Sequence, residues 1–254
     1  MNEKIKNNRM FMQCPSFADS MFESDQKSGV AHPTYDYYIT SEFIELPTFD
    51  AAITDSSYMN LLDKRRSERV YTDEPVTQEQ LAFMLWSVGG IQRASGASTL
   101  RPVASGGARH PFEYYFAVTN VDGLEPGFYH YVPTKNIGEK KVTIERLGPL
   151  FDDYENNMND LVVGQKWVTK APVVLFVSCI PYRAEWRYSD AAQRVMLIDL
   201  GHIGQNLMLS ATAMGLGSCC IAAYDQKKCD ETFSLDGVDE YTVYVLPFGN
   251  LKAK

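Results

Sequence analysis

No apolar stretch of the 254-residue chain approaches the ~20 residues that a membrane-spanning helix needs. Residues 1–10 are polar, and no apolar segment of the kind found in export signals follows them, so we predict a cytoplasmic protein. Positive charge is also scarce, because 24 lysines and arginines stand against 32 acidic residues and the net charge is −8. We therefore expect neither nucleic acid nor an anionic membrane as a partner.

Cysteine is sparse as well. The five cysteines include no CxxC pair and no zinc-binding spacing, so we expect reduced thiols and no metal site. We interpret the neighbours Cys219 and Cys220 as small core residues, with a redox-active pair as the alternative. The chain also lacks the GxGxxG, GxxxxGK[ST], HExxH and GxSxG motifs, and no local pattern marks a catalytic triad.

What the chain does contain is an interspersed series of strand and helix patterns. Apolar runs and alternation predict strands at residues 112–118, 128–132, 142–147, 172–180 and 241–248, and amphipathic spacing predicts helices at 77–88 and 151–163. There are no repeats and no linkers, so the predicted class is α+β, with one domain at residues 58–254. Residues 1–57 are rich in aromatic side chains without a steady period, which favours an N-terminal arm lying over the body or over a second subunit.

The segment 190–214 predicts a long helix, because it has no proline and is apolar on almost every side, as buried helices are. Gly215 and Gly217 would end it, and residues 218–223 predict a short buried strand or turn. Gly201 and Gly204 would let another backbone come close. One helix face carries a polar stripe of Asp199, His202, Gln205 and Asn206. The stripe faces either a bound molecule or subunit, or core hydrogen-bond partners; we favour the second, since buried polar groups usually pair.

Two short segments are candidates for ligand binding. The sequence RRSER at 65–69 can offer forked donors to a phosphate; the alternative is a solvated basic helix end. Residues 93–107 are small and polar, which is typical of a binding loop. The SGG at 105–107 exposes peptide N–H groups that can meet the oxygen atoms of a ligand, and a plain linker is the alternative.

Five blocks occur in order along the chain: RRSER at 65–69, SGGARHPFEYY at 105–115, GLEPGFYHYVP at 123–133, DLGHIGQNLMLSATAMGLGSC at 199–219 and YVLPFG at 244–249. Together they resemble the nitroreductase superfamily of flavin enzymes, and within it the SagB-type, azoline dehydrogenase-like branch. The resemblance implies a mixed, mostly antiparallel sheet flanked by helices. It also implies an intertwined homodimer around the long helix, with FMN bound at the dimer interface.

The resemblance also implies roles for individual residues. It places the FMN phosphate and ring edge at Arg65, Arg66, Ser67 and Arg69. It places the loop that the other subunit lays on the flavin at Ser105, Gly106 and Ala108. It places the backbone that passes the reactive ring nitrogen at Cys220, Ile221, Ala222 and Ala223, and Lys252 is an additional phosphate candidate.

Azoline dehydrogenases carry a Lys-Tyr pair ahead of the central helix, and the matching positions here are Arg187 and Tyr188. Arginine is not deprotonated in proteins, so Arg187 is a poor base, although it can orient a substrate or stabilise an anion. The first hypothesis is therefore an FMN enzyme that uses NAD(P)H to reduce electron-poor acceptors such as nitroaromatics or quinones. One alternative is a SagB-type dehydrogenase that oxidises azolines in peptide natural-product maturation, with a peptide cyclase as partner. Another is a non-catalytic flavin-binding protein.

Overall fold

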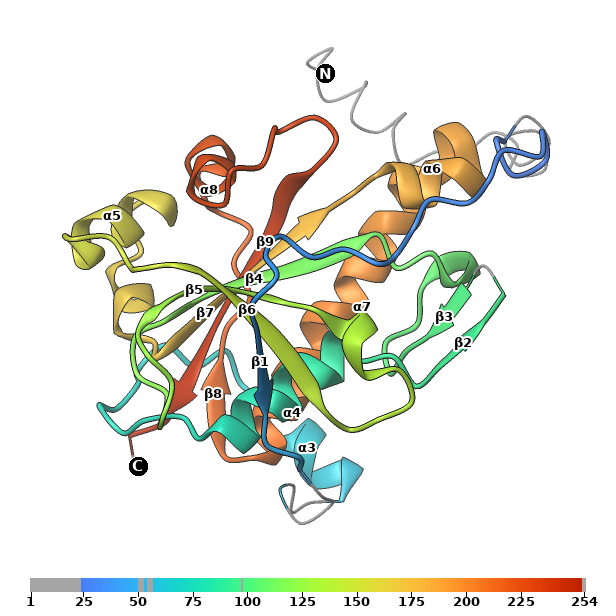
Figure 1. The fold of residues 1–254 in the computed structure, drawn as a ribbon. Helices are drawn as coiled ribbons and strands as arrows, with labels where there is room; N and C mark the ends of the chain where they lie inside the picture. Colours follow the sequence, from blue (N-terminus) through green and yellow to red (C-terminus); the bar gives the residue numbers. More distant parts are fainter. Residues whose placement is uncertain (1–23, 50–52, 54–56, 97, 253–254) are drawn as a thin grey trace, which may run out of the picture.

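The structure, a computed structural model, describes residues 24–49, 53, 57–96 and 98–252. The first part of the predicted arm, residues 1–23, lies outside the described residues, as do 50–52 and 54–56. The rest of the arm lies along the body, and its last part adds an edge strand to the main sheet (Figure 1).

A seven-stranded sheet forms the centre of the molecule, in the order β1-β6-β5-β4-β7-β9-β8. Its strands are β1 Phe43–Leu46, β4 Phe112–Val118, β5 Gly127–Tyr131, β6 Val142–Gly148, β7 Val173–Cys179, β8 Leu216–Ser218 and β9 Tyr241–Asn250. Every strand pairing in it is antiparallel, and the isolated parallel bridges of the described residues are those of Ser67 with Ser218 and Val76 with Val121. The predicted α+β class with a mostly antiparallel sheet is confirmed.

Helices cover both faces of the sheet (Figure 1). They are α3 Tyr58–Lys64, α4 Gln78–Gly89, α5 Tyr154–Leu161, α6 Tyr182–Tyr188, α7 Ala192–Ala213 and α8 Gln226–Thr232. Side chains alternate along β4: Tyr114 and Phe116 pack in the layer with α4 and α7, whereas Tyr115 and Ala117 pack in the layer with α5 and α8. Every residue of β7 is buried, as expected of a central strand.

Helix α4 begins where the sequence predicts. The Thr77 hydroxyl accepts from the Gln80 N–H at 3.2 Å, and the Gln80 side chain accepts from the Thr77 N–H at 3.0 Å, which completes a capping box. The segment after α4 differs from the prediction of an unstructured loop over 93–107. Its first part forms a hairpin of β2 Arg93–Ser95 and β3 Ser98–Leu100. The small polar residues of this hairpin show no apolar alternation, so the pattern did not reveal it.

The predicted long helix is α7, which ends at Ala213 with Met214 as its C-cap, before a left-handed Gly215 with a φ of +73°. Its predicted burial on every side is not found in the single chain. Leu197 and Ile198 are 48% and 51% exposed, and no element of the described chain covers the side that carries them. The apolar pattern therefore predicted the helix correctly but overstated how much of it one chain covers.

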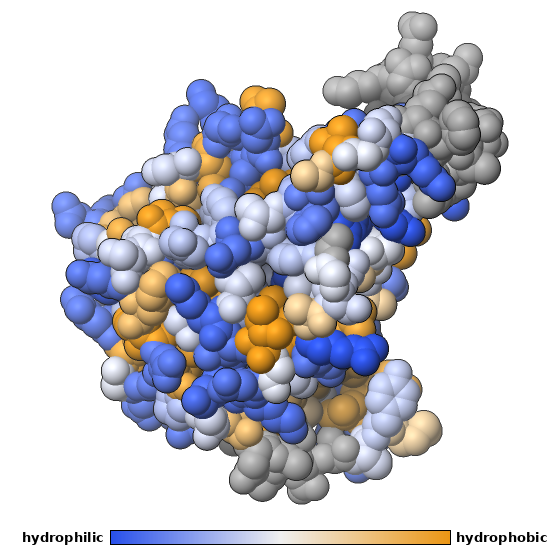
Figure 2. Space-filling model, turned by 45° about the vertical axis from the view of Figure 1, so that its right-hand side comes forward, coloured by the Kyte–Doolittle hydropathy of each residue, from blue (hydrophilic) through white to orange (hydrophobic). Residues whose placement is uncertain are grey.

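The described surface is mixed in polarity. The face shown in Figure 2 interleaves hydrophilic and hydrophobic side chains, without one continuous apolar area. Across residues 24–252, leaving aside the undescribed gaps, no helix has both the length and the apolar character that crossing a bilayer requires.

Candidate functional site

The arginine cluster, residues 65–69, lies on extended chain and not on a helix. Helix α3 ends at Lys64, and Arg65 has a ψ of 122°. Ser67 then bridges Ser218 of β8, and the Glu68 N–H donates to the Ser218 carbonyl at 3.0 Å. This pairing fixes the cluster against the strand that follows α7. The alternative of a basic helix end holds for its first residues, because Arg65 is the C-cap of α3 and Arg66 donates to the Asp63 carbonyl in the last turn of that helix.

Two of the three guanidinium groups of the cluster, those of Arg66 and Arg69, have carbonyl partners among the described residues. Arg66 Nη1 donates to the carbonyls of Asp63 and Arg65, both at 2.8 Å, and Arg69 Nη1 donates to the Ser67 carbonyl at 3.3 Å. In the described part of the chain, none of the three arginines forms an ion pair with a carboxylate. Carbonyl oxygens orient a guanidinium without neutralising it, so the cluster presents uncompensated positive charge to an anion.

The segment Cys220 to Ala223 follows directly after β8, beside the cluster. Ile221 pairs with Val245 of β9, donating to its carbonyl at 2.8 Å and accepting from its N–H at 3.2 Å. Ala222 and Ala223 are exposed, and their N–H groups donate no hydrogen bond to any described residue. These two peptide groups are therefore free to bind polar atoms of a ligand.

The thiol of Cys220 is not activated. Cys219 is buried and Cys220 half-buried, and both are free. Burial raises the pKa of Cys220 to about 11, although a hydrogen bond with Tyr244 and the charge of Arg65 act in the opposite direction. A protonated thiol is a poor nucleophile, which supports the interpretation of the pair as small core residues.

The C-terminal tail also reaches the cluster. Leu251 forms a bridge with Tyr71, which follows the arginines in the chain, and the next residue is the exposed Lys252. A Cβ on Gly217 of β8 would lie 2.2 Å from the Leu251 side chain, so glycine allows this close packing. Lys252 follows Leu251 directly, and its role at a phosphate stays a prediction.

The second candidate segment, Ser105 to Ala108, is attached to α7 of its own chain. The Ser105 hydroxyl donates to Asp199 Oδ2 at 2.7 Å, and the Gly106 N–H donates to both Asp199 oxygens at 3.1 Å. Burial raises the pKa of Asp199, although the bonds from Ser105 and Gly106 oppose this effect. The loop then turns through two left-handed residues, Gly107 and Ala108, with φ values of +58° and +52°.

The polar stripe of α7 is largely used within the chain. Besides Asp199, His202 Nδ1 lies 3.2 Å from the Ala104 carbonyl oxygen, and Asn206 donates to the Ser87 carbonyl. The favoured interpretation, intramolecular hydrogen bonding, is confirmed for these three residues. Gln205 is exposed.

Arg187 and Tyr188 lie at the end of α6, against the same loop. A Cβ on Gly107 would lie 2.5 Å from Arg187 Nε and 2.7 Å from the Tyr188 hydroxyl, so only glycine permits this contact. Tyr188 is 8% exposed. The sequence analysis did not identify α6 as a helix. The run AEWRY, with its good helix formers between a predicted strand and a predicted helix, was the available signal.

The predicted site residues therefore form two groups at different ends of α7 (Figure 1). The cluster group comprises residues 65–69, 220–223 and 252, beside α3 and β8 at the C-terminal end of α7. The loop group comprises residues 105–108 and 187–188, beside Asp199 and α6 at the N-terminal half of α7.

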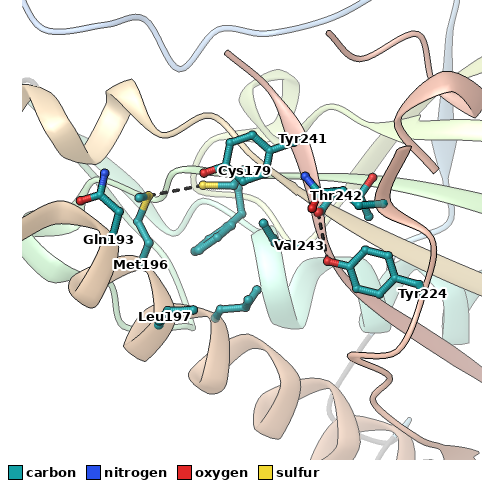
Figure 3. A pocket seen from close by; sticks show the side chains of 11 residues that line it. Cys179, Gln193, Met196, Leu197, Tyr224, Tyr241, Thr242 and Val243 are labelled. Atoms are coloured by element: carbon teal, nitrogen blue, oxygen red, sulfur yellow. Dashed lines mark hydrogen bonds between the residues drawn. The ribbon is translucent and has the colours of Figure 1, made fainter. Parts of the chain in front are cut away.

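A mainly apolar cavity of about 270 Å³ lies between α7 and the first residues of β9 (Figure 3). Met196 and Leu197 line it from α7, and Tyr241 and Val243 line it from β9. Tyr224, the residue after the 220–223 segment, also lines it and is fixed by a 3.0 Å hydrogen bond to the Thr242 carbonyl. Room for a flat apolar group therefore adjoins the exposed backbone of that segment.

A third set of charges, which the sequence analysis missed, is buried between the arm and the sheet. We call Glu113, His130, Glu145 and Arg183 the buried ion cluster. Arg183 pairs with Glu113, and His130 lies 2.7 Å from Glu145 Oε1 and 3.4 Å from Glu113 Oε2. Burial alone would lower the pKa of His130, but the two glutamates raise it above its usual value. Its members are far apart in sequence, so no local pattern indicates them.

Comparison with known proteins identifies the family. The sequence model of the nitroreductase family matches residues 62–250. A "putative nitroreductase" of Methanocaldococcus jannaschii is 30% identical over 206 residues, which cover 81% of this chain and 95% of that protein. The microcin B17-processing protein McbC of Escherichia coli is 24% identical over 246 residues, 95% of this chain and 86% of that protein.

Among solved structures, the E. coli microcin synthetase McbBCD complex with truncated pro-MccB17 bound contains a chain of the same fold. The match has a TM-score of 0.59 at 19% identity and covers 98% of this chain and 92% of that one. The predicted resemblance, including that to the SagB-type branch, is confirmed by these relatives. The chain belongs to the nitroreductase family, whose members typically depend on a flavin, and it is an oxidoreductase.

Proposed function

We propose that two copies of this chain bind FMN between them and transfer hydride from NAD(P)H to an electron-poor acceptor such as a nitroaromatic or a quinone. The observation that carries the proposal is the position of three uncompensated arginines beside the free peptide N–H groups of Ala222 and Ala223. One region suits a phosphate and the other suits the polar edge of a ring system. FMN has both parts.

The donor set fits this group chemically. Arg65, Arg66 and Arg69 would hold the phosphate through charged hydrogen bonds, with Lys252 adding charge. The backbone of residues 220–223 would bind the ring. Once bound, the flavin supplies the hydride chemistry, while the protein binds, orients and tunes it. The apolar cavity next to Tyr224 suits a flat, aromatic acceptor.

The need for two copies follows from the separation of the cluster group and the loop group along α7. In a two-fold dimer that packs α7 on α7, the loop group of one copy approaches the cluster group of the other. The exposed side of α7 supports this arrangement. Gly201 is exposed and a Cβ there would meet no described atom within 4 Å, so no contact within the described part of its own chain explains the glycine. Close approach of a second helix would explain it.

A Gly201→Leu variant tests the assembly. Leucine is a better helix former than glycine, so the single chain should fold at least as well, while the larger side chain keeps a second helix away. We expect loss of the dimer together with loss of bound FMN, measured by light scattering and by the absorbance and mass of the released chromophore. Gly201→Ala is the control and should keep most of both. A variant that stays dimeric and yellow would refute the α7 contact.

Turnover is tested by reducing the bound flavin with NADH or NADPH and reoxidising it with a panel of nitroaromatics and quinones. Reduction followed by acceptor-dependent reoxidation supports the proposal. A protein that binds FMN but is reduced by neither donor would instead be a flavin-binding protein without this activity.

The second candidate is oxidation of azoline rings in a peptide, with a cyclase partner. It is favoured by the similarity to a microcin-processing protein over 95% of this chain and by the position of Arg187 and Tyr188 against the loop. Arg187 is a poor base, which leaves proton removal to Tyr188. Incubation with a heterocyclised peptide decides between the two candidates, because azoline oxidation removes two hydrogens per ring and mass spectrometry detects the loss.

A further inference from the structure

The N-terminal residues 24–40, which we call the strap, run along α6 (Figure 1). The Gln26 N–H donates to the Trp186 carbonyl at 2.8 Å, and Trp186 Nε1 donates to the Val30 carbonyl at 2.9 Å. On the next turn of α6, the Tyr182 hydroxyl donates to Asp25. These bonds attach the start of the strap to the helix that carries Arg187 and Tyr188.

The other end of the strap is fixed to the body. The Tyr37 hydroxyl donates to Glu240 Oε2 at 2.7 Å. The N–H groups of Ile39 and Thr40 donate to the two oxygens of Glu145, at 2.7 and 2.5 Å. A segment held at both ends has little freedom, so the side chains between them are presented in fixed positions.

One strap side chain reaches the loop group directly. Arg187 Nη1 donates to Gln26 Oε1 at 2.9 Å. This partner is neutral, and in the described part of the chain Arg187 forms no ion pair with a carboxylate. Arg187 Nε is buried and has no hydrogen-bond partner there. The guanidinium is thus oriented but not neutralised.

A second cation strengthens the positive potential. The Arg109 guanidinium stacks over Trp186, with its Cζ 5.0 Å from the ring centroid, so a second arginine packs against α6 at the residue next to Arg187 in sequence. Burial lowers the pKa of Arg109, and the nearby charge of Arg187 acts in the same direction. Two like charges held close together favour an anion between or beside them.

We propose that Gln26 is a positioning residue that presents Arg187 as an uncompensated cation to a carboxylate of the substrate. The inference rests on the proposed function in one respect, since the substrate must approach the loop group. It assigns the strap a share in the binding site and narrows the substrate class to acceptors that carry an anionic group. An aspartate or glutamate in place of Gln26 would hold Arg187 equally well but would cancel its charge.

Substitutions of Gln26 therefore test the inference. Gln26→Glu has the same shape and keeps the hydrogen bond, but converts it to an ion pair. Gln26→Ala removes the bond and leaves the charge. Tyr182→Phe is the matched control, because it removes a different bond between strap and α6. The acceptors are 4-nitrobenzoate and the neutral 4-nitrobenzamide, compared by kcat/KM with KM and kcat resolved separately. Binding of benzoate and benzamide is measured by calorimetry on the same proteins.

We expect the wild type to have a higher kcat/KM for the carboxylate than for the amide. Gln26→Glu should reduce this ratio by about tenfold or more, because a hydrogen bond to a charged group is lost. The change should lie mainly in KM. Gln26→Ala should weaken carboxylate binding less and keep the preference. Tyr182→Phe should leave the ratio unchanged. An unchanged ratio in Gln26→Glu, or a wild type without any preference, would overturn the inference and leave a strap that only stabilises the fold.

Failure of the inference and failure of the proposed function give different results. If the wild type holds FMN and turns over but Gln26→Glu behaves like wild type, the inference is wrong and the proposed function stands. If the wild type holds no FMN, the proposed function is wrong. The benzoate titration then still decides the inference, because Gln26, Arg187 and Arg109 belong to one chain.

Discussion

Arginine occurs in two contrasting settings in this molecule, the buried ion cluster and the arginine cluster beside β8. Arg183 is 2% exposed and pairs with Glu113, whose carboxylate also faces His130. Arg66, in contrast, is exposed and meets only carbonyl oxygens, and no carboxylate of the described chain pairs with it. The partners of the guanidinium, and not the residue type, distinguish an arginine that stabilises the fold from one that can bind a ligand.

Removing a charge should also have a different energetic effect in each setting. A buried charge is costly unless it is paired, so removing one partner leaves the other as an uncompensated charge in a dry environment. An exposed, unpaired charge contributes little to the free energy of unfolding. Its removal therefore lowers only the affinity for an anion. Substitutions in the two settings should therefore separate stability from cofactor affinity.

The largest expected effect is on folding and comes from Arg183→Met, which leaves Glu113 buried without its cation. We expect the free energy of unfolding to fall by about 3–5 kcal/mol, measured by urea denaturation. Adding Glu113→Gln to this variant should recover part of the loss, because the uncompensated charge is then gone. Equal losses in the single and double variants would mean that packing, and not charge, holds this region together.

A smaller effect, confined to the ligand, is expected from Arg66→Ala. FMN affinity should fall by about 1.5–3 kcal/mol, the usual value of a hydrogen bond to a charged group, while the free energy of unfolding without FMN should stay within about 0.5 kcal/mol of wild type. A fluorescence titration of flavin measures the first quantity and urea denaturation the second. Lys141→Ala, which removes an exposed cation elsewhere, is the control. Unchanged flavin affinity would remove Arg66 from the site.

Most of the sheet and the long helix were predictable because their signals are local. The continuous apolar run before Cys179 and the alternation in β4 identify strands, and Thr77 with Gln80 marks the start of α4. The exposed side of α7 was not predictable in the same way. A hydrophobic pattern indicates burial, but it does not say whether the same chain supplies the cover.

The candidate site was predictable only in part. Ser67 and its neighbours were identified from a motif, and in the structure Ser67 bridges Ser218, two residues before the 220–223 segment. The link between Ser105 and Asp199, and the one between Gln26 and Arg187, join residues 94 and 161 positions apart. Such contacts depend on how strands and helices are arranged in space, so the spacing of residues in the sequence does not predict them.

The smallest expected effect concerns how the free energy of unfolding depends on pH. The glutamates raise the folded pKa of His130 above its unfolded value of about 6.5, so its contribution to stability is complete below that pH and is lost as the pH rises through the folded pKa. The free energy of unfolding should therefore decrease on the alkaline side of about pH 6.5, by about 1.4 kcal/mol for each unit of pKa shift. Urea denaturation from about pH 6 to pH 9 measures this loss. His130→Gln should abolish that part of the slope. Arg66→Ala should keep it, because Arg66 meets carbonyl oxygens and no carboxylate of the described chain pairs with it. A slope that survives in His130→Gln would show that another group, and not the buried ion cluster, is responsible for the pH dependence.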